Sequence, residues 1–95
     1  MEKDQIDQFW KDGYVVVESV VPRELIEEAN IVLKQLIEAS CKVTLSNSIY
    51  DLSDQHTEHV PSVRRIKDPH LVHRVYDQIM RSDTVLDCVR ALLGP

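Results

Sequence analysis

The sequence is poor in the residues that build many small catalytic sites. Its two glycines, Gly13 and Gly94, exclude a glycine-rich loop of the kind that cradles a phosphate. Its two cysteines, Cys41 and Cys88, are too few and too far apart for a disulfide framework or a zinc knuckle, so two free thiols in a reducing compartment are expected. No apolar run approaches the roughly 20 residues of a membrane-spanning helix, and the acidic start is unlike a secretion signal. We therefore expect a cytoplasmic protein with no membrane partner.

Charge is distributed unevenly along the chain. The net charge is −5 over 95 residues, and residues 1–40 contain four basic against nine acidic side chains, whereas residues 41–95 contain seven of each. An acidic first half does not suit a polyanionic partner. The one basic cluster, at Arg64, Arg65 and Lys67, is short and is interpreted as the solvated face of a strand. The charge pattern therefore argues against a nucleic-acid partner.

The first 40 residues show helical spacing interrupted by one β-branched run. Ile6, Phe9 and Trp10 lie at i, i+3 and i+4, which predicts a short helix over residues 3–11 with the aromatic pair in the core. Gly13 is interpreted as its left-handed stop. The run from Tyr14 to Val17 predicts a buried strand. From residue 22 onward, apolar residues at spacings of three and four predict a helix of about 17 residues with a weak N-terminal cap.

The second half begins with a stretch that lacks periodicity. Residues 41–61 are rich in Ser, Asn, Asp, Thr and His, and they predict a variable, mobile loop with a short strand near residues 43–45. Val63 to Ile66 is the next predicted strand. Asp68, followed by a proline, is expected to cap a third helix, and Ser82 to cap a fourth that ends at Gly94. The chain is thus predicted to be α+β, mainly helical, with two or three short strands.

Four histidines raise the question of a metal site. His56-Thr57-Glu58 has the H-x-[DE] form of a two-histidine-one-carboxylate iron site, and His70 or His73 would have to supply the third ligand. Such ligands belong on rigid strand ends, whereas these residues lie in a polar stretch, so a solvated loop is the preferred interpretation. His70 and His73 share a predicted helix face but lack further ligands at zinc spacing.

No thiol nucleophile is predicted either, because neither cysteine has a base partner in the sequence. No catalytic, cofactor-binding or metal-binding residue is therefore assigned in this chain. Tyr50, the one aromatic residue of the polar stretch, is kept as a candidate substrate-lid residue.

Taken in order, these segments resemble the start of the phytanoyl-CoA dioxygenase family of non-haem iron and 2-oxoglutarate oxygenases. The phrase F-x-x-x-G-Y-V-V-V is met at Phe9 to Val17, and a proline-led helix with an early acidic residue is met at Pro22 to Leu25. A strand followed by helices that end in Leu-Leu-Gly is met at Val63 to Gly94. The resemblance covers nearly all of the chain except residues 41–61.

The resemblance implies that residues 1–95 form a single incomplete domain, the N-terminal outer layer of a double-stranded β-helix, or jelly-roll, oxygenase of cupin-like form. The family's H-x-D motif, its distant second histidine and its 2-oxoglutarate-binding arginine match no residue here. Fe(II) and 2-oxoglutarate are thus implied for the full-length protein, with no cofactor bound by this chain. The expected partners are the remainder of its own domain and a small-molecule substrate.

The implied function is that of a scaffold portion, inactive alone, of an enzyme that hydroxylates an aliphatic carbon of a small organic or acyl substrate. The alternative is a complete small helical interaction module without catalytic activity. Two features disfavour this alternative: the Tyr14 to Val17 strand requires sheet partners, and the long polar stretch interrupts a compact bundle.

Overall fold

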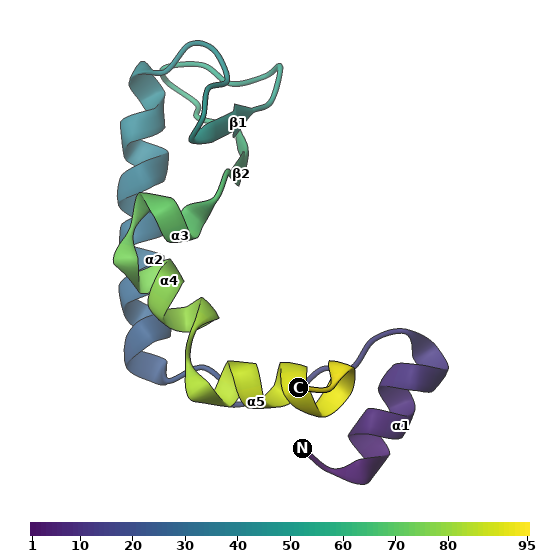
Figure 1. Cartoon of the computed structure of the whole chain (residues 1–95). Helices are drawn as coiled ribbons and strands as arrows, with labels where there is room; N and C mark the ends of the chain where they lie inside the picture. The colour runs from purple at the N-terminus through teal and green to yellow at the C-terminus, as the bar shows by residue number, and fades with distance from the viewer.

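The computed structural model describes all 95 residues and shows an α+β chain, which confirms the predicted class (Figure 1). The chain contains five α-helices, one 3-10 turn and a two-stranded antiparallel sheet. In chain order the elements are α1 (Lys3–Asp12), α2 (Arg23–Ala39), η1 (Ser40–Lys42), β1 (Tyr50–Leu52), β2 (Val63–Ile66), α3 (Pro69–Val72), α4 (Arg74–Met80) and α5 (Asp83–Leu93). No helix combines the length and the apolar character that crossing a membrane would require.

The chain is elongated. Its Cα radius of gyration is 16.7 Å and its extents are 48 × 27 × 20 Å, whereas a compact domain of this length would have a radius of about 12 Å. Helix α2 forms a spine with the sheet at one end and α3 and α4 along its side, while α5 and α1 lie beyond its other end (Figure 1). The buried residues are Val32, Ser40, Tyr50, Leu52 and Val75. The core therefore lies entirely in the part of the molecule that is built on α2.

Two tyrosine hydroxyls attach later elements to this spine. The hydroxyl of Tyr50 in β1 donates to the carbonyl oxygen of Leu36 at 2.7 Å, and that of Tyr76 in α4 donates to the carbonyl of Ala29 at 2.9 Å. The two carbonyls lie seven residues apart, or two helical turns, so both phenols meet the same face of α2. Val75, which precedes Tyr76 in α4, is fully buried. The order of these contacts along α2 sets where the sheet and α4 lie.

The helix boundaries follow the sequence closely, but two predicted caps differ. α1 ends at Gly13, which has the predicted left-handed conformation (φ 84°), and α2 begins after Pro22 without a side-chain cap, as expected from the weak start. Asp68 and Ser82 occupy the predicted N-cap positions, yet neither makes a side-chain cap hydrogen bond. The backbone of Asp68 is itself left-handed (φ 43°), whereas an N-cap residue usually has an extended backbone.

The predicted third helix is divided at His73. The extended backbone of His73 ends α3, and its Nδ1 accepts a hydrogen bond from the backbone N–H of Val75 at 3.0 Å, which caps α4. The imidazole thus takes a backbone N–H group that a continuous helix would use in its own hydrogen bonds. The prediction of one continuous helix after Asp68 is therefore wrong.

The expectations for Tyr14 to Val17 and for the aromatic pair of α1 are also wrong in this structure. Residues 14–17 are not in a strand, and their backbone groups form no hydrogen bond within the chain. A strand exists only against a partner edge, and β1 and β2 pair with each other instead. Trp10 is 67% exposed and meets Phe9 edge-on, with ring centroids 5.2 Å apart. The apolar stripe of α1 contains no buried residue.

Residues 41–61 contain the strand β1, which the sequence did not predict there. Asn47 organises the turn before it: its Oδ1 accepts from the N–H groups of Ile49 and Tyr50 at 2.9 and 2.8 Å. The strand predicted near residues 43–45 does not form, because the short polar side chains of the following turn place the extended backbone at Tyr50–Leu52 instead. The partner strand, Val63–Ile66, has the predicted bounds.

The register of the sheet pairs Tyr50 with Ile66, Asp51 with Arg65 and Leu52 with Val63, with an irregularity after Asp51. Arg65 and Asp51 form a cross-strand ion pair at 2.9 Å. Arg64 and Arg65 are exposed, as predicted for a solvated strand face. Lys67 is partly covered, and its Nζ donates to the carbonyl of Asn47 at 2.7 Å.

Candidate functional site

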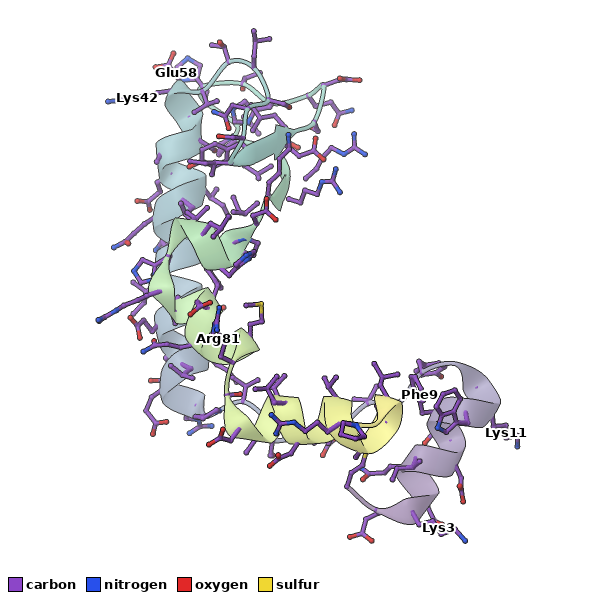
Figure 2. The ribbon with its side chains drawn as sticks, in the orientation of Figure 1. Lys3, Phe9, Lys11, Lys42, Glu58 and Arg81 are labelled. Carbon is purple, nitrogen blue, oxygen red and sulfur yellow. The ribbon has the colours of Figure 1, made fainter.

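The polar segment of residues 40–62 folds over the carboxyl end of α2 and contains most of the residues singled out from the sequence. A hollow of about 350 Å³ lies here, lined by residues 41–44 on one side and residues 56–58 on the other. Figure 2 shows two residues of opposite charge, Lys42 and Glu58, at this end of the molecule. Five of its seven lining residues are polar or charged, and His56 is one of them.

His56 joins three parts of the chain through one imidazole ring. Its Nε2 lies 3.0 Å from the carbonyl oxygens of both Ser40 and Val43, and its Nδ1 accepts from the backbone N–H of Ser62 at 2.9 Å. Because an amide only donates and a carbonyl only accepts, these contacts select the neutral ring with its proton on Nε2. One side chain thus connects the end of α2 to the residue that precedes β2.

This position corrects the interpretation of His56 as part of a solvated loop. The ring is partly buried and both of its nitrogens are engaged by the backbone. Glu58 and His59 beside it are exposed. The structure does not gather His56, Glu58 and His70 or His73 into a metal-binding arrangement, and no group of three or more His, Cys, Asp or Glu side chains converges.

His70 and His73 do not share a helix face, contrary to the sequence interpretation. The break after α3 places His70 in α3 and makes His73 the N-cap of α4. Cys41 borders the hollow and Cys88 lies in α5; both are free thiols.

Tyr50, the candidate lid residue, is 6% exposed, and its ring turns toward α2. Besides the hydroxyl bond to Leu36, its backbone N–H donates to Asn47 Oδ1. Burial raises the pKa of the phenol. These contacts give Tyr50 an anchoring role in the segment, and its contribution to a substrate lid stays a prediction.

No pattern in the sequence indicated the role of His56. A histidine among Ser, Asp and Thr reads as a solvated loop, because the three partners of its ring lie at positions 40, 43 and 62 and meet only after folding. The two anchoring tyrosines were equally hard to detect, since a tyrosine hydroxyl that binds a helix carbonyl leaves no spacing signal.

A second candidate site is a surface rather than a pocket. We call residues 14–17 the unpaired segment, because their backbone groups form no hydrogen bonds within the chain. Tyr14 and Val16 are 62% and 73% exposed, whereas Val15 and Val17 are partly covered, an alternation typical of a strand with one face packed. Other large apolar side chains are exposed along the helices: Trp10, Ile26, Ile31, Leu71, Val89 and Leu93.

Comparison with known proteins gives a distant relationship. The chain is 27% identical over 94 residues to a probable alpha-ketoglutarate-dependent hypophosphite dioxygenase of Stutzerimonas stutzeri. The similarity covers 99% of this chain and 33% of the relative, so the chain spans about a third of the length of the curated protein it matches. No family model and no solved structure matches the chain. The chain is thus distantly related to one part of a dioxygenase that depends on alpha-ketoglutarate, which is 2-oxoglutarate.

Proposed function

We propose that this chain is the N-terminal supporting portion of an Fe(II)- and 2-oxoglutarate-dependent dioxygenase of the phytanoyl-CoA dioxygenase family, inactive alone. The observation that carries the proposal is the similarity to a 2-oxoglutarate-dependent dioxygenase, which extends over 99% of this chain but only 33% of that protein. It runs through the unpaired segment, the spine α2 and α5 alike, so the whole chain corresponds to one portion of a larger domain.

The unpaired segment supports the same proposal on physical grounds. Backbone N–H and C=O groups that face another surface require hydrogen-bond partners, and residues 14–17 have none in this chain. A valine-rich segment whose side chains are alternately exposed and partly covered is suited to joining a sheet edge. We infer that the remainder of the domain supplies that edge and also covers the exposed apolar side chains of α1 and α5.

The residues of this chain do not fit as ligands of the iron. Both nitrogens of His56 are bound by the backbone, and no cluster of carboxylates and imidazoles converges elsewhere. In the proposed enzyme the remainder of the domain would hold Fe(II) and 2-oxoglutarate, with which O2 would convert an X–H bond of the substrate into X–OH while 2-oxoglutarate is oxidised to succinate and CO2. This chain's contribution is structural: it holds α2 and the elements packed on α2 in place, and it presents the unpaired segment to the remainder of the domain.

The substrate class we propose is a small organic or acyl molecule that is hydroxylated at an aliphatic carbon. A second candidate is an inorganic phosphorus oxyanion, since the relative's name gives hypophosphite as its substrate. Both are X–H hydroxylations, and they differ in the polarity of the pocket they need.

The test is turnover of 2-oxoglutarate by the full-length product of the gene. With Fe(II) and oxygen present, succinate should form with a matching substrate, and phosphite should form from hypophosphite only if the second candidate is right. The 95-residue chain, assayed in parallel as a control, should form none. A full-length product that neither binds 2-oxoglutarate nor encodes an H-x-D motif would refute the proposal.

The alternative of a complete interaction module is separated by solution behaviour. A supporting portion studied alone should self-associate or bind a hydrophobic dye through its exposed apolar side chains. A monodisperse monomer that melts cooperatively would favour the module.

A further inference from the structure

The loop of residues 53–62 is attached to the rest of the chain in two chemically different ways. At its base, the N–H of Ser53 donates to the carbonyl of Ser62 at 2.9 Å, and the two serine hydroxyls are 2.7 Å apart. Its connection to the end of α2 passes through His56, whose ring contacts Ser40 and Val43. The base involves no group that changes charge near neutral pH, whereas the connection to α2 depends on one that does.

We propose that His56 is a pH-sensitive switch: its neutral ring links Ser62, at the base of the loop of residues 53–62, to the end of α2, and its protonated ring stays with the end of α2 and releases Ser62. The inference is independent of the proposed function. In the neutral ring, Nδ1 carries the lone pair that accepts the N–H of Ser62. Protonation places a hydrogen on Nδ1, so two donors face each other and this bond is lost.

The two sides of the ring respond in opposite directions. Nε2 keeps its hydrogen in both charge states, so its contacts with the carbonyls of Ser40 and Val43 persist and become charge-assisted. The protonated ring therefore stays with the end of α2 and releases Ser62. Because the Ser53–Ser62 base does not depend on the ring, the β1–β2 pairing is retained while Ser62 separates from the ring.

Other titratable groups around the hollow do not duplicate this response. Cys41 and Lys42 border it from η1, and Glu58 borders it from the loop. The ammonium of Lys42 repels a positive imidazole, whereas the carboxylate of Glu58 attracts one. None of Cys41, Lys42 and Glu58 forms a hydrogen bond with the ring. His59 lies in the same loop, is exposed and makes no hydrogen bond, so His59→Gln is the matched control.

The experiment is an NMR titration of the isotopically labelled full-length protein between about pH 8 and pH 5, the interval in which imidazoles change charge. The ring nitrogen shifts of His56 report its tautomer and its protonation, and amide exchange reports the protection of Ser62 after correction for the intrinsic rate. We expect the Nε2–H tautomer at the upper limit. As His56 gains its proton, Ser62 should lose roughly tenfold in protection, as for one hydrogen bond, with Ser53 unchanged.

Two variants complete the test. His59→Gln should titrate like the wild type, and His56→Gln should show a Ser62 amide whose protection no longer varies with pH. The proposal is overturned if Ser62 keeps its protection while His56 becomes charged, if His56 stays neutral throughout, or if the pH response survives in His56→Gln. Should His56→Gln not fold, the wild-type titration decides alone, because it compares two nuclei in one molecule.

Discussion

The body of the molecule consists of α2, η1, the two-stranded sheet, α3 and α4, whereas the terminal region consists of α1, the unpaired segment and α5. Both regions contain amphipathic helices, yet only the body has a core. All five buried residues lie in the body. There, side chains distant in sequence reach the backbone of α2 and its end: Tyr50 to Leu36, Tyr76 to Ala29 and His56 to Ser40. In the terminal region, one long-range hydrogen bond joins Thr84 Oγ1 to the carbonyl of Val20. An apolar stripe becomes a core only where another element faces it.

The strongest test of this contrast places the same charge in each region. Val75→Asp buries a carboxylate where the side chain is fully enclosed, and it should lower the free energy of unfolding by about 3 kcal/mol or more. Val89→Asp puts the same group on α5 at a site that is 45% exposed, and it should change stability by less than about 0.5 kcal/mol. Urea denaturation of the 95-residue chain, in which Val89 is exposed, measures both when followed by circular dichroism. Equal losses would mean that α5 is packed in a core as α4 is.

Removal of the tyrosine hydroxyls tests how the body is attached to its spine. Tyr50→Phe and Tyr76→Phe each delete one hydrogen bond to a carbonyl of α2, and each should cost about 1 kcal/mol. Tyr14→Phe is the matched control, since the ring of Tyr14 is 62% exposed and its hydroxyl has no partner. A Tyr14 variant that lost as much stability as the other two would contradict the assignment of the anchoring role to the body.

Alkaline pH should weaken the same two anchors. Burial raises the pKa of Tyr50 and of Tyr76 above the ordinary value of 10.0. Near and above that pH the unfolded phenols lose their protons first, so the unfolded state binds fewer protons and stability falls as the pH rises. Below it, the contribution of both hydroxyls is fully present.

The measurement is the urea midpoint of the wild type and of the Tyr50→Phe/Tyr76→Phe double variant between about pH 8 and pH 11. Lysines titrate in both proteins, so the difference between the two curves isolates the phenols. Parallel curves would show that the hydroxyls have the same affinity for protons in the folded and unfolded states.

The smallest effect is expected at the start of α5. The Oγ of Ser82 is buried without a hydrogen-bond partner and makes no cap bond, so Ser82→Ala should change stability by less than about 0.5 kcal/mol. Thr84→Val removes the hydroxyl that binds Val20 and keeps the side-chain shape. It should increase amide exchange in α5 without affecting α4. If Ser82→Ala were the more disruptive change, Ser82 would be acting as a cap after all.

The sequence predicted elements whose signals are local. The spacing of Ile6, Phe9 and Trp10 marked α1, the left-handed stop at Gly13 marked its end, and the β-branched run at Val63 to Ile66 marked β2 with its observed bounds. It missed β1 and the break at His73, because each depends on a side chain that competes for the backbone: Asn47 in the first case and the imidazole of His73 in the second.

What the sequence alone determined is the identity of the helices, the acidic first half and the order of segments that relates the chain to an oxygenase, since all of these are properties of neighbouring residues. Only the tertiary structure decided which apolar faces are buried, that Tyr14 to Val17 has no strand partner, and that His56 links three segments. The physical reason is that burial and hydrogen bonding depend on what lies opposite a residue in space. For His56 the partners lie up to 16 residues away along the chain, a separation that no local pattern encodes.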